Sequence, residues 1–230
     1  MIKIVIALVG LIAWAPAALA QPKITFPGSP WDFGEMLQSQ KVSHKFEVHN
    51  AGKDTLFISR VKPACGCTSA PLTKDVVAPG ESIWLDVTFN SKRFAGLVHK
   101  SVAFYSNDPE HPEADLAFSA TIETARKTVE ALEEPVDLGN LLPNRTGQAQ
   151  IRLTNIGDQP YRLSLADWPG EWLEADWRER VIDPGDTLTL TVGTQGVPPL
   201  GRFDESITFD VEGKVKSRFS LPITGIGLVE

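Results

Sequence analysis

Cysteine, positive charge and helical patterning are scarce in this chain of 230 residues. Its only two cysteines, Cys65 and Cys67, confine any sulfur chemistry to one short stretch. The 22 Lys and Arg are outnumbered by 29 Asp and Glu, so the chain is acidic. Because no basic stripe is available to displace counterions from phosphates, we predict that the chain has no nucleic-acid partner.

Sequence signatures of the common enzyme classes are also missing. The chain has no Gly-x-Ser-x-Gly elbow, no His-Glu-x-x-His zinc motif, no phosphate loop and no dinucleotide fingerprint. No stretch beyond the N-terminal segment shows sustained helical periodicity, whereas an α/β enzyme fold needs helices between its strands. We therefore predict a protein that is not an enzyme and uses no cofactor.

Long apolar runs are absent except at the N-terminus. Lys3 precedes an apolar run over residues 4–15, and Ala18-Leu19-Ala20 forms a small-x-small cleavage site. The run is shorter than the roughly 20 residues that a membrane span needs. Residues 1–20 therefore predict a secretory signal rather than an uncleaved anchor. We expect a periplasmic or secreted protein that is not membrane-spanning after signal cleavage.

The sequence does contain an internal repeat with an offset of 105 residues. Asn50-Ala-Gly52 closes one alternating segment, and Asn155-Ile-Gly157 closes a similar one. The same offset relates further pairs of positions: Asp32 and Asp137, Gly34 and Gly139, Pro79-Gly80 and Pro184-Gly185, Gly96 and Gly201, Phe104 and Phe209. A repeat of this length indicates two complete domains rather than solenoid units of about 20–50 residues. We predict one module over residues 21–125 and a second, without cysteines, over 126–230.

Both modules are predicted to be all-β. In the first, alternating segments are separated by turn residues, and they lie near residues 31–34, 41–49, 55–62, 83–89, 98–105 and 115–122. Six or seven short strands in about 100 residues are typical of an immunoglobulin-like sandwich. We therefore predict two tandem immunoglobulin-like antiparallel β-sandwich domains, joined near residues 123–130.

Several motifs in the first module occur together in one bacterial family. They are Trp31-Asp-Phe-Gly34, Phe46-Glu-Val-His-Asn50-Ala-Gly52, Cys65-Gly-Cys-Thr68, Val77-Ala-Pro-Gly80 and Ser101-Val-Ala-Phe-Tyr-Ser-Asn107. Through them, residues 24–123 resemble the family of domain of unknown function 1573. The resemblance implies an exported immunoglobulin-like sandwich, similar to Hydin and major-sperm-protein modules, without an established activity. The second module looks like a diverged copy.

The stretch Cys65-Gly66-Cys67 could be a structural disulfide or a redox-active one. A Cys65–Cys67 disulfide would pin a tight turn, and Gly66 would relieve part of its strain by adopting unusual backbone angles. The same strain would suit a labile redox couple. The usual signs of thiolate activation are missing, since the nearest cations in the sequence are Arg60 and Lys62.

A soft-metal site is the third interpretation of this pair. Two thiolates suit Cu(I) or Zn but need one or two further ligands. All four histidines lie in the first module, and His44 is the candidate third ligand beside Cys65 and Cys67. Because His44 shares a strand face with Phe46 and Val48, the pattern favours a satisfied core histidine, and we predict no metal.

The second module replaces the cysteines with other residues. Gly170 aligns with Cys65 and Trp172 with Cys67, so the frame does not require the cysteine pair. Trp168, Trp172 and Trp177 alternate with carboxylates, which is the composition of a sugar-binding platform, but packing within or between modules is the favoured interpretation. If Trp172 fills the space that the Cys65–Cys67 disulfide occupies in the first module, we expect its side chain to be buried.

The overall functional prediction is a binding or scaffolding protein. Its partner is expected to be a protein or another component of the bacterial envelope. The alternative is a thiol–disulfide or soft-metal handling protein that acts through Cys65 and Cys67. An acidic loop is interpreted as solvated rather than as a Ca²⁺ site, because its spacing differs from that of an EF-hand; it carries Asp108, Glu110, Glu113 and Asp115.

Overall fold

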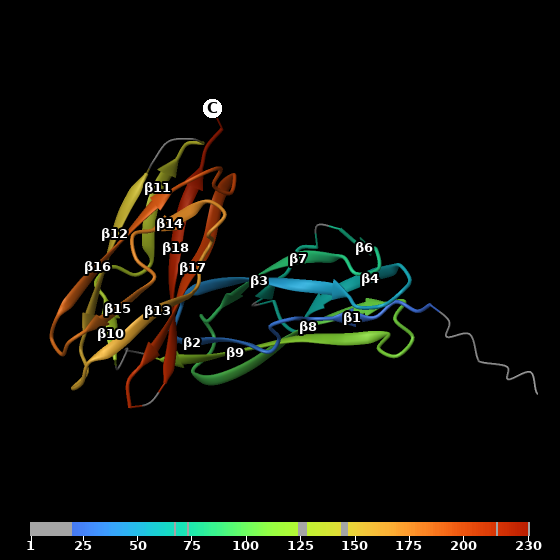
Figure 1. The fold of residues 1–230 in the computed structure, drawn as a ribbon, viewed down its shortest axis with the longest axis horizontal. Coiled ribbons are helices and arrows are strands. Elements are labelled where there is room, and N and C mark those ends of the chain that lie inside the picture. Colours follow the sequence, from blue (N-terminus) through green and yellow to red (C-terminus); the bar gives the residue numbers. More distant parts are fainter. Residues whose placement is uncertain are drawn as a thin grey trace, which may run out of the picture.

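Two β-sandwiches, set at an angle to each other, make up the protein (Figure 1). The computed structural model describes residues 20–66, 68–72, 74–123, 128–143, 147–214 and 216–229. Every named element in these ranges is a strand, so the predicted all-β class is confirmed. Most of the predicted signal, residues 1–19, lies outside the described residues. In the described part of the chain, no helix is long and apolar enough to cross a membrane.

The first sandwich packs a four-stranded sheet against a larger one. The small sheet has the order β1 (Ile24–Thr25), β3 (Lys41–Asn50), β7 (Ser82–Asn90), β5 (Thr68–Ser69). The facing sheet contributes β2 (Trp31–Leu37), β9 (Glu113–Glu123), β8 (Gly96–Ser106), β4 (Leu56–Pro63) and β6 (Val76–Val77). Alternating residues point inward and bury Phe46, Phe89, Phe104 and Phe118. The six predicted strands are confirmed, whereas β1, β5 and β6 are too short to show periodicity.

The second sandwich has the same plan. Its small sheet has the order β10 (Val129–Ala131), β12 (Gln148–Asn155), β16 (Thr187–Thr194), β14 (Leu173–Ala175). Its facing sheet contributes β15 (Glu179–Ile182), β13 (Tyr161–Asp167), β17 (Gly201–Glu212), β18 (Ser217–Gly227) and β11 (Val136–Leu141). Trp172 and Trp177 belong to its core, beside Phe209 and Phe219.

Hydrogen bonds recur at the offset of 105 residues. In each sandwich an asparagine side-chain amide donates to two carbonyl oxygens, Asn50 to Asp54 and Val77, and Asn155 to Gln159 and Ile182. The repeated residues therefore make the same turn contacts in both sandwiches. The predicted boundary between residues 125 and 126 falls within residues 124–127, outside the described part.

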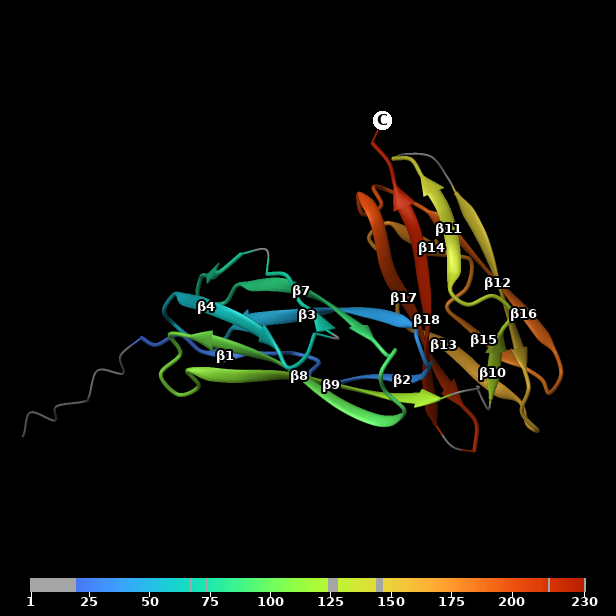
Figure 2. The same ribbon diagram turned by 180° about the vertical axis from the view of Figure 1, so that it is seen from behind.

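The two sandwiches share one continuous sheet. Strand β18 pairs in parallel with β2 through Phe219 and Glu35, so the two larger sheets join into a sheet of ten strands. Both views show β2 reaching β18 at the junction (Figures 1 and 2). Gly34 has a φ of +70° and lies so close to Arg218 that an added Cβ would meet the backbone oxygen of Arg218 at 2.2 Å. Only glycine permits this approach. Strand β3 contacts the second sandwich separately, through hydrogen bonds between Ser43 and Ser206 of β17.

Candidate ligand-binding cleft between the two sandwiches

A cleft of about 480 Å³ lies between the two sandwiches. The first sandwich lines it with residues of β3 and β7, which are Ser43, His44, Lys45, Trp84 and Asp86. The second sandwich lines it from the end of β13 and the segment after it, and from β17 and the segment before it; these residues include Asp167, Trp168, Glu171, Val197, Pro199 and Glu205. Its volume lies in the range of small-molecule sites, and such sites commonly form at domain interfaces.

Strand alternation explains which side chains of the first sandwich face the cleft. Phe46 and Leu85 oppose each other and point into the core. Their neighbours Lys45 and Asp86 also oppose each other, and they point to the outer face of the sheet. Trp84 lies on this outer face as well, with 48% of its surface exposed. The fold therefore presents a large aromatic ring on the same face as this pair of opposite charges.

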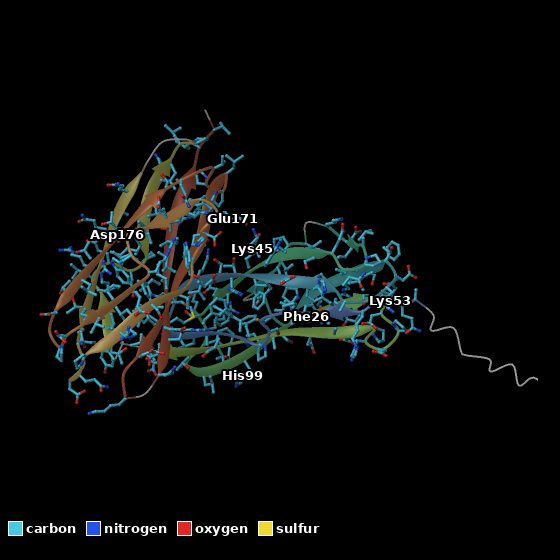
Figure 3. All side chains as sticks on the ribbon, viewed as in Figure 1. Phe26, Lys45, Lys53, His99, Glu171 and Asp176 are labelled. Carbon is cyan, nitrogen blue, oxygen red and sulfur yellow. The ribbon has the colours of Figure 1, made fainter. Side chains whose placement is uncertain are left out.

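Lys45 reaches across the mouth of the cleft. Its Nζ lies 2.7 Å from Oε1 of Glu171 and 5.9 Å from the centroid of the Trp84 ring. Figure 3 shows Lys45 and Glu171 at the angle between the sandwiches. Since both side chains are exposed, such a pair contributes only about 0–1 kcal/mol, and it opens readily.

His44 connects the sandwiches at the inner end of the cleft. Its Nδ1 lies 2.6 Å from Oδ2 of Asp167, and its ring stacks on Trp31 at a centroid distance of 3.8 Å. The histidine is satisfied, as its position beside Phe46 predicted, but its partner comes from the second sandwich. The sequence carried no signal for this pair, because the two residues are 123 positions apart.

Glu205 is the most perturbed carboxyl group of the cleft. Burial raises its pKa, and the negative charges of Asp86 and Asp167 raise it further, although the Ser43 hydroxyl, 2.7 Å away, donates to it and opposes the shift. Lys45 also opposes the shift. The ionised form of Glu205 is therefore costly in this cleft unless a positive charge approaches.

The tryptophans predicted as binding residues occupy different environments. Trp172 also lines the cleft, but it is 5% exposed and packs against Phe203. Trp177 is 7% exposed and donates its indole N–H to the carbonyl of Thr189. Trp168 is half-buried, lines the cleft and carries the guanidinium of Arg178 over its ring at 3.9 Å. Among these three, Trp168 is the ring best placed to contact a ligand. Trp84 was missed, although its outward position in an alternating strand was visible in the sequence.

The cysteine turn lies at a second hollow. No free cysteine occurs among the described residues. Cys67 lies outside the described residues, so the predicted pairing of the two stays a prediction. The hollow of about 350 Å³ beside Cys65 is also lined by Lys92 and Arg93. The fold thus places Lys92 and Arg93, which are distant from Cys65 in the sequence, at the same hollow as this residue.

The candidate metal ligands are not gathered in one place. Cys65 lines the second hollow, whereas His44 lines the cleft between the sandwiches. Over the part of the chain that the structure describes, no group of three His, Cys, Asp or Glu side chains could hold a metal ion. The soft-metal interpretation therefore gains no support from this geometry.

The prediction that the acidic loop is solvated was wrong for Asp108. Asp108 is 1% exposed rather than solvated. Burial alone would raise its pKa, but the backbone N–H groups of Ile24, His111 and Glu110 donate to it and together lower the pKa below its usual value. Asp108 is thus a structural residue that ties strand β1 to this loop.

Two tandem all-β sandwiches define the immunoglobulin-like class that the sequence predicted, and this fold class is confirmed. Residues 24–122 match the family described as "Protein of unknown function (DUF1573)", which confirms the family resemblance of the first sandwich. No functionally curated protein matches the chain.

The solved structures that match this chain have low sequence identity to it. A protein of unknown function from Porphyromonas gingivalis W83 is 15% identical, with 88% of this chain and 99% of that chain covered and a TM-score of 0.36. The ASH / PapD-like domain of human CEP192 is 15% identical, with 45% and 87% covered and a TM-score of 0.35. The YadV chaperone is 11% identical, with 86% and 98% covered and a TM-score of 0.30.

Proposed function

We propose that this chain is an exported, non-enzymatic binding protein whose ligand site is the cleft between the two sandwiches. The observation that carries the proposal is the convergence of polar groups and aromatic rings from both sandwiches on one cleft of about 480 Å³. The ligand would be a component of the bacterial envelope, because the apolar N-terminal segment has the features of a secretory signal.

Binding fits the cleft better than catalysis. His44 is the obvious proton-transfer group, but Asp167 and the stacked Trp31 ring hold it at the junction of the sandwiches. Among the described residues, no hydroxyl or thiol contacts its other ring nitrogen, so a nucleophile–base pair is not assembled there. The contacts of His44 instead position one wall of the cleft against the other.

A thermal-shift screen tests this site. A ligand that binds only the folded protein raises its melting temperature. We expect compounds that stabilise the wild type to lose this effect in Trp84→Ala and to retain it in Phe57→Ala, which also removes an exposed ring, but from β4. Stabilising compounds that act equally on both variants, or a broad screen without any hit, would contradict the proposal.

The export component has an independent test. Fractionation of the native cells should recover the protein outside the cytoplasm, with Gln21 as its first residue. An intact N-terminus at Met1 in the cytoplasmic fraction would contradict export while leaving the cleft proposal standing.

A second candidate function is thiol–disulfide exchange at Cys65 and Cys67. The observation that favours it is that Lys92 and Arg93 line the same hollow as Cys65. A thiolate of an external dithiol would attack the disulfide, and the released cysteine thiolate would be stabilised by these cations. The second thiol would then resolve the mixed disulfide. The external dithiol leaves as a disulfide, and its two protons end on the cysteine sulfurs.

Redox titration tests this candidate. In dithiol buffers of graded poise, the Lys92→Gln/Arg93→Gln variant should need a more reducing poise than the wild type to reach half reduction. Arg60→Gln/Lys62→Gln removes the cations that are adjacent in sequence and is the matched control. Equal half-reduction poise in both variants would contradict the thiol–disulfide exchange function. Metal analysis of the reduced protein exposed to Cu(I) tests the soft-metal alternative.

A further inference from the structure

The cleft carries more negative charge than its own cations balance. Asp167 pairs with His44, and Glu171 pairs with Lys45. Asp86 and Glu205 also line the cleft, and neither forms an ion pair with a cation among the described residues. A ligand that brings positive charge to these two carboxylates would relieve their mutual repulsion.

The aromatic walls of the cleft already hold cations of the chain itself. The Lys45 ammonium lies over the Trp84 ring, and the Arg178 guanidinium lies over the Trp168 ring. Cations are attracted to aromatic faces by the ring quadrupole, by about 0.5–1 kcal/mol at exposed sites. Val197 and Pro199 add apolar surface to the same cleft. The walls therefore suit a ligand that combines a cationic head with an apolar stem.

We propose that the cleft binds a primary alkylammonium group, supplied either by a free polyamine or by a lysine side chain of a partner. This inference rests on the proposed function of the cleft as the ligand site. The ammonium would lie between Asp86 and Glu205, and its methylene stem would pack on Trp84. An ammonium fits better than a guanidinium, because the two carboxylates come from different strands, β7 and β17, and do not offer one planar, bidentate acceptor.

Lys45 is a built-in competitor for this ligand. Its ammonium occupies the region between Trp84 and Glu171, which an incoming ammonium would share. Lys45→Met keeps most of the apolar stem and removes the charge, so it should bind the ligand about 3–10-fold more tightly. A gain in affinity cannot be produced by a variant that merely misfolds.

Isothermal titration calorimetry with spermidine and with a short lysine-rich peptide tests the inference and separates its two sources. Glu205→Gln should weaken binding of at least one of these probes about 10-fold or more. The control Glu174→Gln removes the same charge from an exposed position outside the cleft and should leave the affinity unchanged. Circular dichroism would verify that each variant is folded.

Three results would overturn the inference. They are no binding of either probe, equal weakening in Glu205→Gln and Glu174→Gln, and no gain in Lys45→Met. If uncharged or anionic compounds stabilise the protein through Trp84 in the thermal-shift screen while both cationic probes fail, only the ligand class is wrong. If no compound acts through Trp84, the proposed function of the cleft fails as well.

Discussion

The two sandwiches keep one frame and fill it differently. Thr68 on β5 opposes Phe89 on β7 in the first, and at the matching positions Leu173 on β14 opposes Thr194 on β16 in the second. All four are buried. In both sandwiches a small residue faces a large one. The large residue is on the central strand β7 in the first sandwich and on the edge strand β14 in the second. The comparison teaches that the frame constrains the volume shared by facing strands rather than the residue at each position.

Exchanging this pair in the first sandwich is expected to give the largest effect. Phe89→Thr should lower the free energy of unfolding by about 3 kcal/mol, because it leaves a cavity in the core. Thr68→Leu should cost about 1–3 kcal/mol through overpacking. If the volumes compensate as in the second sandwich, the double variant should be less destabilised than the sum of the single ones. Urea denaturation measures all three, and strict additivity would break the comparison.

The turn contacts that the two sandwiches share provide a test of their equivalence. Asn50→Ala and Asn155→Ala each remove two side-chain donors and leave buried carbonyl oxygens unsatisfied. Each should lower the free energy of unfolding by about 2 kcal/mol. Similar losses in chemical denaturation would support equivalent roles. A large loss in one sandwich and none in the other would indicate that only one depends on this turn.

Asp108 marks a difference, because Gly213 stands at the matching position of the second sandwich. Its lowered pKa means that its stabilising contribution is present above the unfolded value of 3.8 and is lost as pH falls through the lower folded pKa. Asp108→Asn should therefore cost about 1–2 kcal/mol at pH 7 and approach the wild type in strong acid. Stability curves of both proteins against pH measure this, and a constant gap would contradict it.

Glu205→Gln is expected to change stability least, and, unlike Asp108→Asn, to raise it. The raised pKa of Glu205 means that its favourable contribution is complete below the unfolded value of 4.5 and is lost as pH rises through the folded pKa. Glu205→Gln should be more stable than the wild type by about 1 kcal/mol at pH 7 and lose this advantage near pH 4. Thermal melts across this range test the sign, and destabilisation at pH 7 would refute it.

The site was less predictable than the strands. Alternation indicated the six main strands of the first sandwich, since each has enough residues to show a period of two. Within β7, the same alternation places Trp84 on the outer face, so one cleft residue was within reach of the sequence. The contact of His44 with Asp167 was not, because it depends on how two separate folding units meet. Asp108 was misjudged because an acidic loop gives no sign that one of its carboxylates turns inward.

The sequence by itself determined the two sandwiches, their turns and the offset between them, because these depend on local periodicity and on residues such as Asn50 and Asn155. Only the tertiary structure decided the cleft. Pairing of β18 with β2, which Gly34 permits by its close approach to Arg218, joins the two sandwiches at an angle (Figure 1). That contact brings Lys45, Glu171 and Glu205 together from strands and loops. Nothing in the sequence of these segments indicates that they meet. Their shared chemistry is a property of the junction rather than of either module.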